Sequence, residues 1–178
     1  MSFGKFRFID VLNKESAKEN MTTKLRKILP SDKNFFAKWW RDKDLIALTS
    51  GDFSVLSDTD INGYFATKLK NQALEYMIDF NGQTIGNISL DKRENGWYEI
   101  QIIIGEKDFW GQGHGTESIK QMVDLAKERK ISKIYLEVRP DNIRAIRAYE
   151  KAGFFKKGIQ NYPKNRNLPQ TLRMELVT

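Results

Sequence analysis

Three closely spaced glycines, Gly111, Gly113 and Gly115, follow an apolar stretch and open a segment with helical periodicity. Glycine lets the backbone adopt conformations that other residues avoid and lets it come close to a ligand. The first N–H groups of a helix have no partner inside the helix, and with the helix dipole they favour an anion such as a pyrophosphate. Residues 102–116 therefore predict a binding site for a phosphorylated ligand.

Two familiar nucleotide-binding motifs fit this segment poorly. A P-loop requires Gly-Lys-Ser/Thr after four spacer residues, and the chain lacks that sequence. A dinucleotide-binding turn follows its strand at once and carries a third glycine where this chain has Thr116. An ordinary glycine-rich turn that only starts a helix stays open as the alternative.

Two linked segments resemble the GNAT superfamily of N-acetyltransferases. Residues 110–116, WGQGHGT, and the amphipathic helix after them resemble its motif A, R/Q-x-x-G-x-G/A, with Trp110 where arginine or glutamine is commonest. The preceding Phe109 makes an aromatic-Trp-Gly sequence similar to that of the ribosomal-protein N-terminal acetyltransferase branch. Residues 142–154, NIRAIRAYEKAGF, resemble motif B nearly in full, in the expected order and with one helix and one strand between the motifs.

The resemblance implies an enzyme that transfers an acetyl group from acetyl-CoA to a primary amine by direct attack in a ternary complex, without a metal. Backbone groups of Ile102, Ile103 and Ile104 are implied to bond the pantetheine arm and to polarise the thioester carbonyl. The rest of the implied cofactor-binding set is Trp110, Gly111, Gln112, Gly113, His114, Gly115, Thr116, Asn142 and Ala145.

Two residues are candidates for acid–base chemistry. Tyr149 matches the position where the family commonly has the acid that protonates the leaving thiolate, although a core tyrosine would show the same spacing. An amine of the lysine type has a pKa of about 10.4, so a base must remove its proton before it attacks. Glu99 lies on the strand that leads to the thioester, where burial would raise its pKa; a carboxylate facing solvent is the alternative. The single histidine, His114, falls in the phosphate-binding window and is not expected to be catalytic.

The amine acceptor is expected to bind against the N-terminal helices. Aromatic residues at helical spacing usually belong to the core, which is the competing interpretation of these candidates. The candidate walls are Trp39, Trp40, Phe53, Tyr64 and Tyr162. A protein N-terminus, an aminoglycoside, a polyamine and an amino sugar all remain possible acceptors at this stage.

Hydrophobic periodicity predicts a mixed α/β (α+β) fold. Asn81-Gly82 and Asn95-Gly96 are hairpin signals between strands, and apolar residues on both faces at 102–104 predict a central strand buried on both sides. The predicted strands are 25–29, 74–80, 83–92, 97–105, 132–138, 154–160 and 171–177, and the predicted helices are 32–44, 61–72, 114–130 and 143–153. The resemblance implies a GNAT-like, mostly antiparallel sheet that splays between strands 97–105 and 132–138, flanked by about four helices. Residues 1–22 are predicted to be an extension, and residues 23–178 a single acetyltransferase domain.

Composition excludes several other kinds of site. The 178 residues include no cysteine and one histidine, which removes disulfides, thiolate nucleophiles and sulfur zinc sites and makes a Ser-His-Asp triad improbable. No apolar run approaches the about 18 residues of a membrane span, and no signal peptide is evident, so a cytoplasmic protein is expected. The net charge of +7 is moderate, and nucleic acid is an unlikely partner. A non-catalytic acetyl-CoA-binding module and an RNA- or ribosome-associated protein are the alternative functions, and a homodimer is possible.

Overall fold

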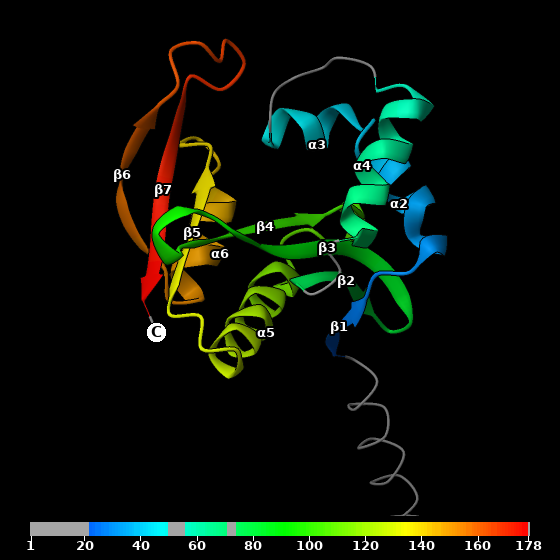
Figure 1. Ribbon diagram of the computed structural model, residues 1–178, viewed down its shortest axis with the longest axis horizontal. Coiled ribbons are helices and arrows are strands. Elements are labelled where there is room, and N and C mark those ends of the chain that lie inside the picture. The colour runs from blue at the N-terminus through cyan, green and yellow to red at the C-terminus, as the bar shows by residue number, and fades with distance from the viewer. Residues whose placement is uncertain (1–21, 50–55, 71–73, 178) are drawn as a thin grey trace, which may run out of the picture.

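One seven-stranded sheet organises the chain. The computed structural model describes residues 22–49, 56–70 and 74–177. The strands are β1 (Thr23–Lys27), β2 (Glu75–Phe80), β3 (Gln83–Lys92), β4 (Tyr98–Ile104), β5 (Lys133–Val138), β6 (Phe155–Asn161) and β7 (Gln170–Val177). They lie in the order β1-β2-β3-β4-β5-β7-β6 (Figure 1). Every neighbouring pair is antiparallel except β4 and β5, which are parallel, so the mixed and mostly antiparallel sheet is confirmed.

Five α-helices accompany the sheet in the described ranges. They are α2 (Lys33–Trp39), α3 (Lys43–Leu48), α4 (Asp58–Lys70), α5 (His114–Glu128) and α6 (Ile143–Lys151). The single helix predicted over 32–44 is in fact two helices. The side chain of Asp42 accepts hydrogen bonds from the N–H groups of Asp44 and Leu45. It therefore caps the N-terminus of a second helix, α3, which begins after α2 has ended. None of the described helices is long and apolar enough to cross a membrane.

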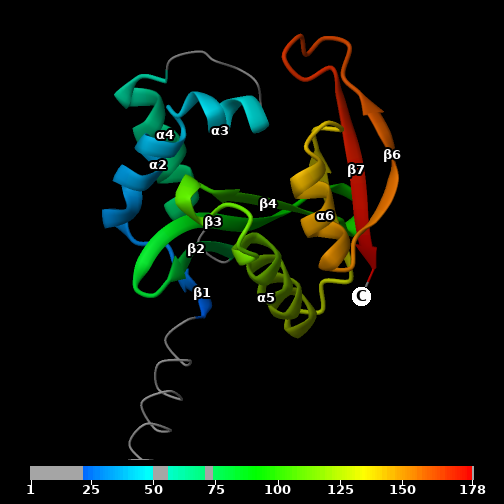
Figure 2. The same ribbon diagram turned by 180° about the vertical axis from the view of Figure 1, so that it is seen from behind.

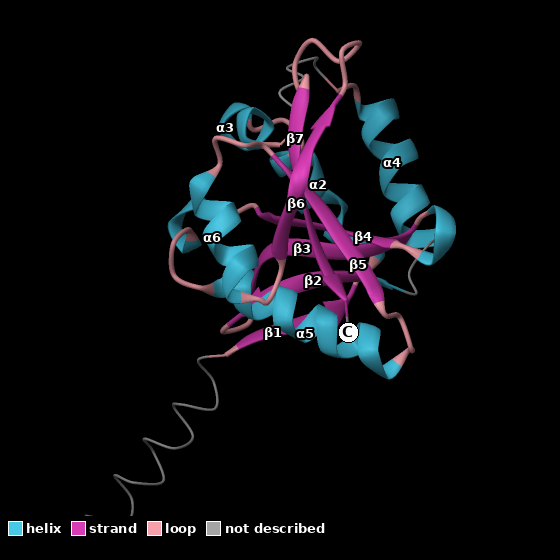
Figure 3. Ribbon diagram, turned by 90° about the vertical axis from the view of Figure 1, so that its left-hand side faces the viewer, coloured by secondary structure: helices cyan, strands magenta, loops and turns pink. Residues whose placement is uncertain are grey.

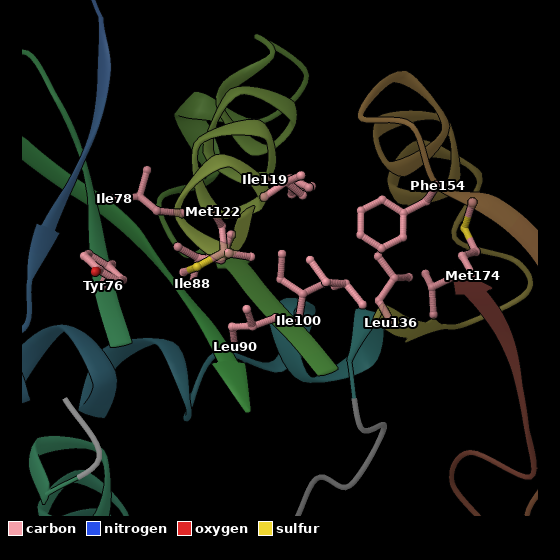
Figure 4. Close-up of a cluster of buried hydrophobic side chains, with 14 of the residues drawn as sticks. Tyr76, Ile78, Ile88, Leu90, Ile100, Ile119, Met122, Leu136, Phe154 and Met174 are labelled. Carbon is pink, nitrogen blue, oxygen red and sulfur yellow. The ribbon is translucent and has the colours of Figure 1, made fainter. Parts of the chain in front are cut away.

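The helices cover both faces of the sheet. Ile119 and Met122 of α5 pack with Ile100 of β4 and Leu136 of β5 in the larger hydrophobic core, which Phe154 after α6 also joins (Figure 4). On the opposite face, Phe36 and Trp39 of α2, Leu45 of α3 and Phe65 of α4 pack on Met77 of β2. Because side chains alternate along a strand, the odd-numbered residues of β4 face these N-terminal helices and the even-numbered residues face α5 and α6.

The sheet opens between its two central strands. The pairing of β4 with β5 consists of Tyr98 with Ile134 and Glu99 with Tyr135. Beyond these residues the strands diverge, and β5, β7 and β6 cross steeply over β2–β4 (Figures 1 and 3). The predicted splay is therefore confirmed.

The expectation that residues 102–104 belong to a central strand packed on both faces is confirmed, but their full burial is not. Ile102, Ile103 and Ile104 are all only partly buried. One edge of β4 faces the opening of the splay instead of a neighbouring strand, so solvent reaches side chains that a closed sheet would cover.

Short-range signals predicted the hairpins well. Asn81 and Gly82 have φ values of 51° and 77°, and Asn95 and Gly96 have 55° and 75°. These left-handed conformations are the ones that asparagine and glycine adopt at low cost, and both turns join antiparallel neighbours. The prediction that residues 1–22 form an extension falls almost wholly outside the described residues and stays a prediction.

Candidate active site

The start of α5 has the backbone expected of an anion site. Gly113 is its N-terminal cap with φ 96°, and Gly111 has φ 78°. A Cβ added at either glycine would meet nothing within 4 Å. Glycine is therefore needed for its left-handed backbone conformation and not because space is short. The side chain of Gln112 donates to the carbonyl oxygen of Asp108, and this hydrogen bond stabilises the conformation of the loop. The first N–H groups of this 15-residue helix remain without helical partners, as a phosphate ligand needs.

Two single substitutions separate the backbone demand from the ligand. Gly113→Ala is expected to cost about 1–2 kcal/mol of folding free energy because of its positive φ. It is also expected to weaken acetyl-CoA binding roughly tenfold or more, because the strained backbone displaces N–H groups that donate to the charged phosphate. Gly63→Ala on α4 is the matched control: its Cβ would meet nothing within 4 Å, and it should stabilise its helix by about 0.5–1 kcal/mol. Thermal unfolding and calorimetric titration with acetyl-CoA measure both effects, and equal affinities of the two variants would contradict the assignment.

The edge of β4 that faces the splay presents selected backbone groups. The N–H of Gly105 donates to the carbonyl oxygen of Ile85 on β3 at 2.8 Å, and Ile103 pairs with Asn87. Backbone groups alternate in direction along a strand, so those of Ile103 point to β3 and those of Ile102 and Ile104 point into the splay. The carbonyl oxygen of Ile104 already accepts a 2.7 Å hydrogen bond from the indole of Trp110. Of the three isoleucines, Ile102 therefore has the backbone groups best placed for a ligand, and Ile103 does not.

Tyr149 lies on α6, partly buried against the larger core with its ring 6.4 Å from that of Phe154. Burial raises the pKa of its hydroxyl to about 12. No described residue accepts or donates a hydrogen bond at this hydroxyl. It is therefore protonated at physiological pH and free to donate, as a general acid must be.

Asn142 and Ala145 are hydrogen-bonded to each other in this structure. The side-chain oxygen of Asn142 accepts a hydrogen bond from the N–H of Ala145 at 3.2 Å and so caps α6. The N–H of Ala145 therefore already has its partner, whereas the amide group of Asn142 can still contact pantetheine.

Glu99 is not the isolated carboxylate that its proposed role as general base requires. Its Oε2 lies 2.6 Å from Nη2 and 2.8 Å from Nε of Arg93, and its side chain is 20% exposed. The hydrogen bond that Arg93 donates to this carboxylate raises the pKa of Arg93. The base assignment of Glu99 stays a prediction that has to account for its ion pair.

The sequence analysis missed Glu137, on the same face of the sheet and beside the splay. Its Oε2 accepts hydrogen bonds from the hydroxyls of Tyr162 at 2.7 Å and Thr171 at 2.6 Å. Burial, followed by the bond to this carboxylate, raises the pKa of Tyr162 to about 12. The available signal was the alternation of β5, which puts Tyr135 and Glu137 opposite three buried apolar residues.

His114 lies at the start of α5 but points into the protein. Its Nδ1 is 2.9 Å from the hydroxyl of Thr23, and its ring packs against Phe80 and Phe109. Its Nε2 is buried with no hydrogen-bond partner among the described residues. Burial lowers its pKa, so the ring is neutral near pH 7 and serves packing instead of chemistry.

The aromatic candidates for the acceptor site differ in exposure and in the contacts they make. Trp39 is 1% exposed, its ring lies against Gly105, and its Nε1 donates to Glu106, so it supports the loop after β4 and is not an accessible wall. Trp40 and Tyr64 meet edge to face, with Tyr64 exposed, and stay candidates. Tyr162 is joined to Glu137, and Phe53 lies outside the described residues.

The chain belongs to the GNAT acetyltransferase family: the family model for the acetyltransferase (GNAT) domain matches residues 23–155. With the glycine-capped helix, the splay and Tyr149, this makes it an acetyl-CoA-dependent N-acetyltransferase. No group of three or more histidine, aspartate or glutamate side chains within the described ranges is arranged to hold a metal ion.

Several known acetyltransferases are similar to it. Aminoglycoside N(6')-acetyltransferase type 1 of Klebsiella pneumoniae is 25% identical over 159 residues, which cover 81% of this chain and 79% of the relative. The structure of AAC(6')-Ib with paromomycin and acetyl-CoA superposes with a TM-score of 0.72 at 23% identity, covering 88% of this chain and 93% of that one. Spermidine N-acetyltransferase from Vibrio cholerae, with CoA and spermine, has a TM-score of 0.73 at 20% identity, covering 87% and 95%. The similarity to the ribosomal-protein branch stays a prediction.

Proposed function

We propose that the acceptor is a small molecule with several amino groups, of the aminoglycoside or polyamine type, and that it binds on the face of the sheet that carries Glu137. The observation that supports this most directly is the charge of Glu137, which has no cationic partner among the described residues. The aminoglycoside and polyamine acceptors named for the similar proteins agree with an acidic site.

Glu137 differs from the other carboxylates on this face because no ion pair holds it within the described residues. Glu99 is paired with Arg93, and Glu175 is paired with Arg173 at 2.8 Å. Glu137 receives only neutral hydroxyl donors, and both bind the same oxygen. Its other carboxylate oxygen is therefore available to an ammonium group, and a charge-assisted hydrogen bond is about twice as strong as a neutral one.

A second acidic group supports an acceptor with more than one charge. Asp42 and Asp44 at the start of α3 share a single lysine, Lys107, at 2.9 Å and 2.5 Å. One negative charge is left over in this cluster. Since α3 and the connection between β6 and β7 extend from the same end of the sheet (Figure 1), we expect this cluster to bind a second amino group of the acceptor.

The proposed reaction uses these groups in one sequence. Glu137 binds the ammonium form of the acceptor and takes its proton, directly or through water. The neutral amine nitrogen then forms a bond to the thioester carbonyl carbon, and backbone groups at Ile102 stabilise the negative oxygen that develops. As the carbon–sulfur bond breaks, Tyr149 gives its proton to the leaving thiolate. The nitrogen loses its second proton, which returns to Tyr149 through water, and the products are an amide and CoA.

Glu137→Gln tests the acceptor class. The substitution keeps the size of the side chain and one oxygen that can accept from Tyr162 and Thr171, and it removes the charge. We expect kcat/KM for kanamycin and spermidine to fall roughly 10²- to 10⁴-fold, because both the general base and a hydrogen bond to a charged group are lost. CoA release is measured with a thiol reagent, and Glu150→Gln on α6, whose carboxylate pairs with Lys156, is the matched control.

Other outcomes would point elsewhere. Acetylation of peptide N-termini and of neither polycation would favour the ribosomal-protein type of activity and contradict the proposed acceptor. Binding of acetyl-CoA without CoA release from any amine would favour the non-catalytic module. The cytoplasmic location and the homodimer remain predictions.

A further inference from the structure

Trp110 is held on three sides. Its Nε1–H donates to the carbonyl oxygen of Ile104 at 2.7 Å, and its ring packs against the hydrophobic cluster of α2–α4 beside Ile103. The guanidinium carbon of Arg144 lies 4.1 Å from the centroid of the indole ring, within the range of a cation–π contact. The position where the resembled motif has arginine or glutamine here holds an aromatic ring on which an arginine from another part of the chain stacks.

This stack joins the two halves of the splayed sheet. Trp110 lies in the loop that follows β4, and Arg144 lies in the first turn of α6, which follows β5. Since β4 and β5 are parallel, the segments after both strands begin at the same, diverging end of the sheet (Figure 2). The pairing of β4 with β5 ends at Glu99 and Tyr135, so the Trp110–Arg144 contact bridges the gap where strand pairing no longer does.

We propose that the Trp110–Arg144 stack is a clasp that positions the pantetheine arm of acetyl-CoA in the splay. It fixes the separation of the two edges between which the arm lies. The bond of Trp110 to Ile104 also occupies the last carbonyl that faces the splay, so the arm is left to pair at Ile102. Trp110 and Arg144 thus act by occupying the Ile104 carbonyl and by setting the distance between the two edges of the splay. Neither side chain touches the reacting atoms.

The competing role for Arg144 is a direct contact with the phosphates of CoA, since it is exposed and cationic. The two roles differ in what the contact needs. A clasp needs the flat guanidinium on the indole, whereas a phosphate contact needs only positive charge. A clasp also acts on a cofactor fragment that has no nucleotide, whereas a phosphate contact does not.

The experiment compares Arg144→Gln and Arg144→Lys with the unaltered protein, using acetyl-CoA and S-acetylpantetheine as alternative acetyl donors. An exposed cation–π contact of about 0.5–1 kcal/mol corresponds to roughly a two- to fivefold loss. We expect that loss in kcat/KM for both donors and in both variants, with kcat at saturating donor unchanged. Trp110→Leu should give a larger loss, and adding Arg144→Gln to it should cause little further change.

A loss seen only with acetyl-CoA, or abolished in Arg144→Lys, would overturn the clasp in favour of a phosphate contact. Additive losses in the double variant, or no loss in Arg144→Gln, would also overturn it. Thermal unfolding of each variant without ligand controls for misfolding. Donor binding is followed by calorimetry without any amine, so the outcome does not depend on the proposed acceptor.

Discussion

Tyr149→Phe is expected to lower kcat by about 10²- to 10⁴-fold, the usual contribution of a positioned general acid. The substitution keeps the ring that packs near Phe154 and removes only the hydroxyl, so KM for acetyl-CoA should change little. Because the pKa of Tyr149 is about 12, this hydroxyl stays protonated across the pH range in which assays are run. Its ionisation therefore adds no alkaline limb to the pH profile of the unaltered enzyme.

Steady-state CoA release, measured with saturating donor and acceptor, tests this expectation. Tyr76→Phe is the matched control, because Tyr76 is a buried tyrosine on β2 whose hydroxyl contacts Arg129 and lies outside the candidate site. Turnover of Tyr149→Phe within about twofold of the unaltered enzyme would remove Tyr149 as the acid and leave water as the proton source.

Arg26→Met is expected to destabilise the fold by about 3–5 kcal/mol, the cost of leaving a buried carboxylate unpaired. Arg26 binds both oxygens of Asp32 at 2.7 and 2.8 Å, and it also donates to Asp79 and Thr84. Asp32 is 2% exposed. One guanidinium thus ties β1 to β2, to β3 and to the turn that leads into α2.

The charge state of Asp32 gives this prediction a dependence on pH. Burial alone would raise the pKa of Asp32, but hydrogen bonds from Arg26 and from the N–H of Leu29 outweigh it, and the pKa is lowered. Its contribution to stability is therefore complete above the unfolded-state pKa of about 3.9 and is lost as the pH falls below it. Arg26→Met should remove that acid dependence.

Denaturant unfolding across pH 3–7 measures both effects, as ~3–5 kcal/mol at neutral pH and a flatter slope in acid. Arg41→Met is the control, since Arg41 pairs with Asp58 at the same 2.7 Å but with both side chains well exposed. Its transition should barely move. Equal losses of unfolding free energy in the two variants would mean that the buried Arg26 network contributes no more than an exposed ion pair.

The sequence by itself indicated the cofactor, through the resemblance of residues 110–116 and 142–154 to the GNAT motifs, and it predicted the order of the elements and a glycine-rich helix start suited to an anion. Those features depend on short segments: positive φ at Gly111 and Gly113, asparagine–glycine hairpins, and alternation or helical periodicity within one element. Backbone preference and burial of one face act over a few residues, so a single sequence is enough to reveal them.

Only the tertiary structure decided which side chains can act. It paired Glu99 with Arg93, left Glu137 without a cation, and set Arg144 on Trp110, and it removed Trp39 from the acceptor site by burying it. Arg144 and Trp110 are separated by 34 positions along the chain and belong to different elements. Their contact depends on how two strands diverge, and the free energy that holds them together comes from the packing of both cores, which no local pattern specifies.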